Sequence, residues 1–162
     1  MAYATQELKS KVLNLIKTNA KEQKIKIGIN ARIRHHSTLM VNINSCSIDL
    51  EQNLIDTLKA TILKFKTEEF KTHYFEIEEL EKTLKENQDY DTEHFNYGGL
   101  SFKEHNLDYY FSGEALDIVK NAFTAIKCEY VNKSDVMTDY FDISYYWHLT
   151  IGNNKDGFQL KA

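Results

Sequence analysis

The sequence predicts an α+β fold, with helices packed on one face of a small antiparallel sheet built from a hairpin and a C-terminal strand. Apolar and polar residues alternate over 25–33 and again over 39–43, and the turn-like HHST between them indicates a β-hairpin. A third alternating segment, 143–151, indicates the C-terminal strand. The remaining apolar residues recur mostly at helical spacing, which indicates the helices.

The first half of the chain shows these elements in order. A helix is expected over 6–22, because Thr5 suits an N-cap and apolar residues follow three or four positions apart: Leu8, Val12, Leu15 and Ile16. The hairpin strands come next. Asp49 followed by Gln52 resembles a capping box and predicts a helix over 50–66, with an inward stripe of Leu54, Leu58, Ile62 and Phe65. A shorter acidic helix is expected over 76–87.

The second half is less regular. Residues 88–112 carry many aromatic residues without clear periodicity, and Gly98-Gly99 marks a turn. Ser112 then caps a helix whose inward residues are Leu116, Val119, Phe123 and Ile126. After the strand over 143–151, a short tail strand is expected at 158–160. We interpret residues 1–162 as a single α+β domain with an acidic, aromatic-rich insertion at about 67–111.

Composition limits the possible classes of protein. No apolar run reaches the roughly 20 residues that span a bilayer, so no membrane partner is expected and a cytoplasmic location is favoured. Cys46 and Cys128 lack CxxC spacing and are expected to be free, buried thiols. Residues 1–36 carry eight Lys/Arg against two Glu, a net charge of +6, and the remainder has a net charge of −10. The two halves either face each other or present opposite surfaces to different partners. The sequence leaves the oligomeric state open.

The outer face of the sheet is the first candidate site. If the isoleucines of the first strand face the helices, its polar residues point the other way. Together with residues of the other strands they form a basic, polar face that could hold single-stranded RNA: Lys24, Lys26, Asn30, Arg32, Arg34, Asn42, Asn44, Tyr146, His148 and Thr150. The alternative is an ordinary solvated sheet face.

The hairpin turn is the second candidate. Residues 32–36, RIRHH, place Arg32, Arg34, His35 and His36 close together, where they could grip a phosphate or an acidic protein surface. A solvated turn that discourages edge pairing is the alternative.

The aromatic segment is the third candidate. Tyrosine buries a large area and keeps a hydroxyl for bonding, which suits protein interfaces. Some of these side chains must cover the core, and the rest are candidates for contact with a protein partner: Tyr90, Phe95, Tyr97, Phe102, Tyr109 and Tyr110.

Catalytic and metal chemistry find little support. Asp135, Asp139 and Asp142 lie in one short connection, where aspartate commonly caps turns, so a Mg²⁺ site is disfavoured. The histidines and cysteines lack zinc-ligand spacing, and no glycine-rich phosphate loop or serine-hydrolase motif occurs. We expect no cofactor, no metal and no enzyme activity.

The segment SDVMTDYFDISYYWHLTIG, 134–152, resembles the C-terminal signature of a large polyvalent protein-associated domain family. The matching residues are Ser37-Thr38, Ser134-Asp135, Thr138 to Asp142, and Tyr145-Tyr146, so the resemblance covers about 1–50 and 112–160. That family occurs in phage, plasmid and conjugative-element proteins, and it offers no catalytic residues to carry over.

The resemblance implies a counter-defence setting in a bacterial host. A small chain of this kind is similar to anti-CRISPR proteins that bind and disable type VI, RNA-cutting effectors. It implies direct stoichiometric inhibition of a bacterial RNA-guided nuclease, in which contact with the guide RNA could take part. From the residues alone, an RNA-binding module that uses the sheet face is the alternative.

Overall fold

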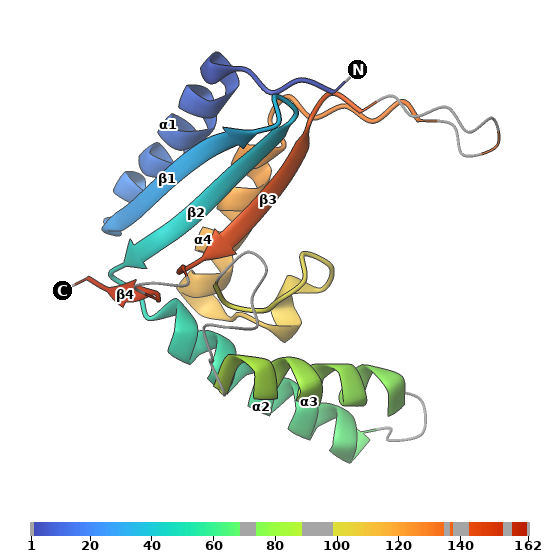
Figure 1. Cartoon of the computed structure of the whole chain (residues 1–162). Helices are drawn as coiled ribbons and strands as arrows, with labels where there is room; N and C mark the ends of the chain where they lie inside the picture. Colours follow the sequence, from blue (N-terminus) through green and yellow to red (C-terminus); the bar gives the residue numbers. More distant parts are fainter. Residues whose placement is uncertain are drawn as a thin grey trace.

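The structure is a computed structural model that describes residues 2–68, 74–88, 99–134, 137, 143–153 and 157–161. Its elements, in chain order, are α1 (Gln6–Glu22), β1 (Ile27–Arg34), β2 (Thr38–Cys46), α2 (Leu50–Glu68), α3 (Tyr74–Gln88), the 3₁₀ helix η1 (Leu107–Tyr109), α4 (Gly113–Ile126), β3 (Tyr146–Ile151) and β4 (Gln159–Leu160). Helices accompany a small sheet (Figure 1), which confirms the α+β class.

The sheet is mixed rather than antiparallel. β1 and β2 form the expected antiparallel hairpin, with Arg34 opposite Thr38. β3 and β4, however, both run parallel to β2. The prediction of an antiparallel sheet is therefore wrong for its C-terminal strands. A parallel pair needs a crossover connection, and the helices between β2 and β3 return the chain to the end at which β2 begins. Alternation of apolar residues carries no information about strand direction.

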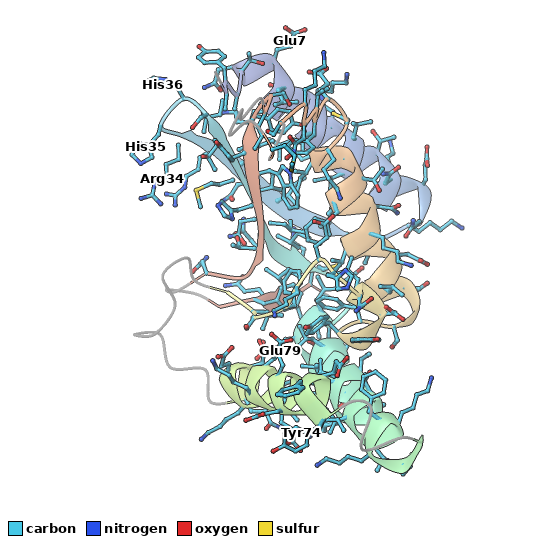
Figure 2. The ribbon with its side chains drawn as sticks, turned by 90° about the vertical axis from the view of Figure 1, so that its right-hand side faces the viewer. Glu7, Arg34, His35, His36, Tyr74 and Glu79 are labelled. Carbon is cyan, nitrogen blue, oxygen red and sulfur yellow. The ribbon has the colours of Figure 1, made fainter. Side chains whose placement is uncertain are left out.

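One face of the sheet carries the main core. α1 and α4 lie on the same side of the strands (Figures 1 and 2) and pack against the alternating apolar residues. The most completely buried side chains of this layer are Val12, Leu39, Val41, Ile43, Val119, Ile126 and Ile151. No helix of the described residues packs against the opposite face of β1, β2 and β3, which we call the open face.

Helix α1 is closed at both ends by local bonds. The Thr5 hydroxyl accepts a hydrogen bond from the Leu8 N–H at 3.0 Å, which confirms the predicted N-cap. At the other end, the Ile25 N–H donates to the Ala20 carbonyl at 2.8 Å, and Lys24 has a φ of 58°. This is a Schellman-type ending with lysine in the position that glycine usually fills. It directs the chain from α1 straight into β1.

Helices α2 and α3 run side by side beyond the end of the sheet (Figure 1), and the stripe predicted for α2 is buried, as are Ile77 and Leu80 of α3. Asp49 Oδ1 accepts the Gln52 N–H at 3.0 Å, so the predicted cap is present. The Gln52 side chain bonds Asp56 instead of returning to Asp49, so the capping box is only half formed.

The segment from 99 to 112 belongs to the core. Leu100, Leu107 and Phe111 are all buried in the main apolar cluster. The Asn87 side chain of α3, which is 1% exposed, bonds both the N–H and the carbonyl of Ser101 at 2.8 Å. This part of the predicted insertion is therefore integrated into the fold.

Ser112 takes the N-cap position of α4, as predicted, but its side chain does not cap that helix. Instead the Thr57 hydroxyl bonds the Ser112 hydroxyl at 3.1 Å, and the Ser112 N–H donates to Asn53 Oδ1 at 3.0 Å. These bonds join the start of α4 to α2.

The basic and acidic halves of the chain meet where α1 packs against α4. Lys11 pairs with Glu129 at 2.6 Å, but the other ion pairs between described residues lie within the acidic part of the chain: Lys66–Glu81, Lys103–Glu79 and Lys127–Glu104. Figure 2 places Arg34 and Glu79 well apart, on the sheet hairpin and on α3. The molecule thus presents a basic sheet and, away from it, a more acidic helical pair.

Candidate nucleic-acid interface

The open sheet face is built from three rows of side chains, each row crossing β1, β2 and β3. Strand register places the following residues side by side on this face: Arg34, Thr38 and Tyr146 in the first row, Arg32, Met40 and His148 in the second, and Asn30, Asn42 and Thr150 in the third. Adjacent strands lie about 4.8 Å apart, so each row spans about 10 Å. The register therefore places these residues of β1, β2 and β3 on one surface.

The cations of this face come mainly from β1. Arg32 and Arg34 are two residues apart, so their side chains leave the same face about 6.6 Å from each other. Both are exposed, and in the described part of the chain no carboxylate forms an ion pair with either of them. Figure 2 shows Arg34 on the side of the sheet away from α1 and α4. Two exposed guanidinium groups at this spacing can bind neighbouring phosphates.

Met40 occupies the centre of the face. It is 8% exposed and lies outside the core cluster, between Arg32 and His148 in its row. Strand alternation places Met40 in phase with Thr38 and Asn42, but an apolar residue in a strand is usually assigned to the core, so its place on this face could not be predicted from the sequence. Its thioether gives the polar face an apolar centre, most of which the rest of the protein already covers.

The third row is ordered by side-chain hydrogen bonds. The Thr150 hydroxyl bonds Asn42 Oδ1 at 3.1 Å, and Asn42 Nδ2 donates to Asn44 Oδ1 at 2.6 Å. Asn42 is therefore held by its neighbours, whereas the exposed Asn30 across from it makes no side-chain bond to a described residue. This row can offer amide groups to the edge of a base.

The hairpin turn holds its two histidines in an unusual backbone conformation. His35 and His36 have φ angles of 52° and 61°, and the Ser37 N–H donates to the Arg34 carbonyl at 3.3 Å. Positive φ at both central positions is typical of a type I′ turn, which Asn-Gly usually fills. Each non-glycine residue in this region costs about 1–2 kcal/mol.

The side chains of the turn are exposed and continue the basic face. Arg34 Nε donates to His35 Nε2 at 3.1 Å, which orients both groups. The positive φ angles of His35 and His36 are strained, and backbone strain often accompanies functional sites. The turn therefore remains a candidate site.

Lys24 and Lys26 do not extend these rows. Both are exposed, but β1 begins only at Ile27, and Lys24 lies in the ending of α1. The alternation argument therefore does not apply to them. They lie at the end of β1 opposite to the His35–His36 turn.

Much of the predicted aromatic contact surface is internal. Tyr110 is 3% exposed and belongs to the core. Phe102 packs edge-to-face against Phe111 at 5.2 Å, and Tyr109 against Phe65 at 5.2 Å. These rings stabilise the fold, and we do not place Tyr110 in a partner surface. The other predicted contacts, Tyr90, Phe95 and Tyr97, lie outside the described residues.

The thiols show no sign of activation. Both cysteines are free; Cys46 is buried, as predicted, but Cys128 is exposed because it follows the end of α4 at Ile126. Burial raises the pKa of both thiols, the opposite of what a nucleophilic thiolate requires. Within the described ranges, no cluster of three His, Cys, Asp or Glu residues suits a metal ion. Asp135, Asp139 and Asp142 lie outside those ranges.

Comparison with protein families, with curated proteins and with solved structures finds no match for this chain. Among the described helices, none is both long and apolar enough to cross a membrane.

Proposed function

We propose that this chain is a binding protein whose open sheet face holds single-stranded RNA. The observation that carries the proposal is the register of the sheet, which brings two arginines, an exposed tyrosine and a histidine onto one surface. Arg32 and Arg34 supply positive charge along one edge of that surface, and Tyr146 supplies an aromatic ring at the other. Positive charge and an exposed ring on one surface are the combination that binds unpaired nucleic acid.

Each part of the face has a distinct role in this proposal. The guanidinium groups of β1 bind phosphates, with bidentate geometry available to each. The bases then lie across β2 toward β3, where Tyr146 gives a stacking surface. The asparagine row offers hydrogen bonds to base edges. The interaction needs no catalytic group, in keeping with a binding role.

The direct test is RNA affinity as a function of salt concentration. For single strands, the slope of log affinity against log salt is about −0.7 for each phosphate neutralised. Substituting both Arg32 and Arg34 by alanine is expected to lower affinity and to reduce the magnitude of that slope by about 1.4. The matched control substitutes Lys82 and Lys85 of α3 by alanine, because it removes the same charge away from the sheet. Equal slopes for the two double variants would remove the sheet face from the proposal.

A second candidate function is direct inhibition of a bacterial RNA-guided, RNA-cutting nuclease by a phage or mobile-element protein, in the cytoplasm of the host. The separation of charge favours it: the basic sheet could contact a guide RNA, while the acidic helix α3 lies beyond the end of the sheet and could contact a basic protein surface.

The inhibitor function is tested by titrating the chain against a purified type VI effector and measuring RNA cleavage. Complete inhibition at a stoichiometric ratio, retained with RNA in excess, is the expected result for an inhibitor that binds the protein. Inhibition that disappears with excess RNA would favour simple RNA binding.

A further inference from the structure

Three separate segments of the chain meet at the end of the sheet nearest the His35–His36 turn. The Tyr3 N–H donates to the Ser144 carbonyl at 2.8 Å, and the Tyr146 N–H donates to the Ser37 carbonyl at 2.8 Å. The segment before α1, the hairpin turn and the start of β3 are therefore fixed side by side. Residues 3 and 146, far apart in sequence, share this end of the sheet.

The direction of the Tyr3 side chain follows from its neighbour. The Ala4 N–H donates to the His36 carbonyl at 2.8 Å, and the Ala4 side chain is 3% exposed in the core. Tyr3 is 60% exposed, so it points away from the core that receives Ala4. The same alternation holds in the segment that Tyr3 contacts, where Tyr145 is buried and Tyr146 is 48% exposed.

Both exposed rings lack partners within the described residues. Neither Tyr3 nor Tyr146 forms a hydrogen bond through its hydroxyl, a ring contact or a cation contact there. By contrast, Tyr130 and Tyr145 pack edge-to-face at 5.7 Å, and the Tyr145 hydroxyl bonds a carbonyl. A large ring left in water without a partner contributes little to the fold, so it is available to a ligand.

We propose that Tyr3 and Tyr146 form a stacking site for unpaired nucleobases at one end of the RNA-binding face. This inference rests on the proposed RNA-binding function and adds to it a residue from outside the sheet. Tyr146 shares its row with Arg34, whose guanidinium has no carboxylate partner among the described residues. An aromatic ring about 10 Å across the sheet from an uncompensated cation favours a nucleotide, with its flat base and its phosphate, over an apolar protein segment.

The test compares RNA affinity for Tyr3→Ala, Tyr146→Ala and the matched control Tyr74→Ala. Tyr74 is 52% exposed but lies on α3, away from the sheet (Figure 2). Loss of one stacked base is expected to weaken binding by about 5- to 150-fold, with the salt slope unchanged because no phosphate contact is lost. Tyr3→Trp and Tyr146→Trp are expected to retain binding, since each keeps a ring, and Tyr74→Ala is expected to bind as the original chain does.

A strand with abasic sites provides the second readout. It is expected to bind the original chain more weakly than the intact strand, whereas the Tyr3→Ala/Tyr146→Ala double variant should scarcely distinguish the two strands. Normal RNA affinity in the double variant would overturn the inference. This also holds if the variant binds RNA normally but no longer inhibits the nuclease, because the tyrosines would then contact a protein.

The RNA-binding function and the tyrosine stacking site can be refuted separately. If the original chain binds RNA with an arginine-dependent salt slope but the tyrosine variants bind normally, only the stacking site is wrong. If the original chain binds no RNA at low salt, the RNA-binding function and the stacking site are both wrong.

Discussion

Asn87 is expected to be a major stabilising residue, although it is polar and lies in a helix. Its side chain is 1% exposed. Its amide nitrogen donates to the carbonyls of Thr83 and Ser101, and its oxygen accepts from the Ser101 N–H, all at 2.8 Å. Since the N–H and the carbonyl of Ser101 both bond the Asn87 side chain, Asn87 pairs with the segment from 99 to 112 as a neighbouring strand would. Replacing Asn87 by alanine removes all three bonds together.

The size of the effect follows from those bonds. A typical hydrogen bond contributes about 1 kcal/mol net, and leaving a partly buried partner without a bond costs somewhat more. Three bonds therefore give a loss of about 2–4 kcal/mol in the free energy of unfolding for Asn87→Ala. In a domain of this size, a loss of 3 kcal/mol corresponds to a fall in Tm of about 6–12 °C.

The assay is urea unfolding at neutral pH, followed by circular dichroism. Asn14→Ala serves as the control, because Asn14 is exposed on α1 and makes no side-chain bond to a described residue. Its expected change is within about 0.5 kcal/mol. Asn87→Asp keeps the acceptor but loses both donors, so it should be destabilising as well. A loss below about 1 kcal/mol for Asn87→Ala would refute the reasoning, because the Ser101 backbone would then be satisfied without this side chain.

Two further predictions concern the sheet and its turn. The Tyr145 hydroxyl donates to the Ile126 carbonyl at 2.6 Å, and burial raises the pKa of Tyr145 to about 12. Because the unfolded chain ionises the Tyr145 hydroxyl near pH 10, the contribution of Tyr145 to stability is complete below pH 10 and is lost as the pH rises to about 12. The Tyr145→Phe variant should therefore show a shallower fall in the free energy of unfolding over that range. Identical pH profiles for the two proteins would contradict the assignment. Replacing His35-His36 by Asn-Gly should raise stability by about 1 kcal/mol, since Asn-Gly suits the turn, while lowering RNA affinity. Unchanged affinity would remove the histidines from the site, and unchanged stability would show that the turn is not strained.

Local patterns predicted most of the elements. The stripe from Leu8 to Ile16 and the cap at Thr5 placed α1, because helix periodicity and capping depend on residues close in sequence. Strand direction could not be obtained in this way: β3 alternates identically whether it runs parallel or antiparallel to β2. The predicted buried state of Cys128 was wrong for a related reason, since the apolar pattern of α4 ends before it.

The candidate site was only partly visible in the sequence. Period-two alternation placed Arg32, Arg34 and His148 on one face without knowledge of the register. Met40 was missed because an apolar residue in a strand is usually assigned to the core. Tyr3 was missed because it precedes the first helix, and only tertiary hydrogen bonds bring it to the sheet.

The most direct test of the central claim is the salt dependence of single-stranded RNA binding, measured for the original chain and for the Arg32→Ala/Arg34→Ala variant. The account predicts measurable affinity at low salt for the original chain, and a slope of log affinity against log salt that is smaller in magnitude by about 1.4 in the variant. Absence of binding at low salt, or the same slope for both proteins, would contradict the claim that the open face of the sheet binds RNA.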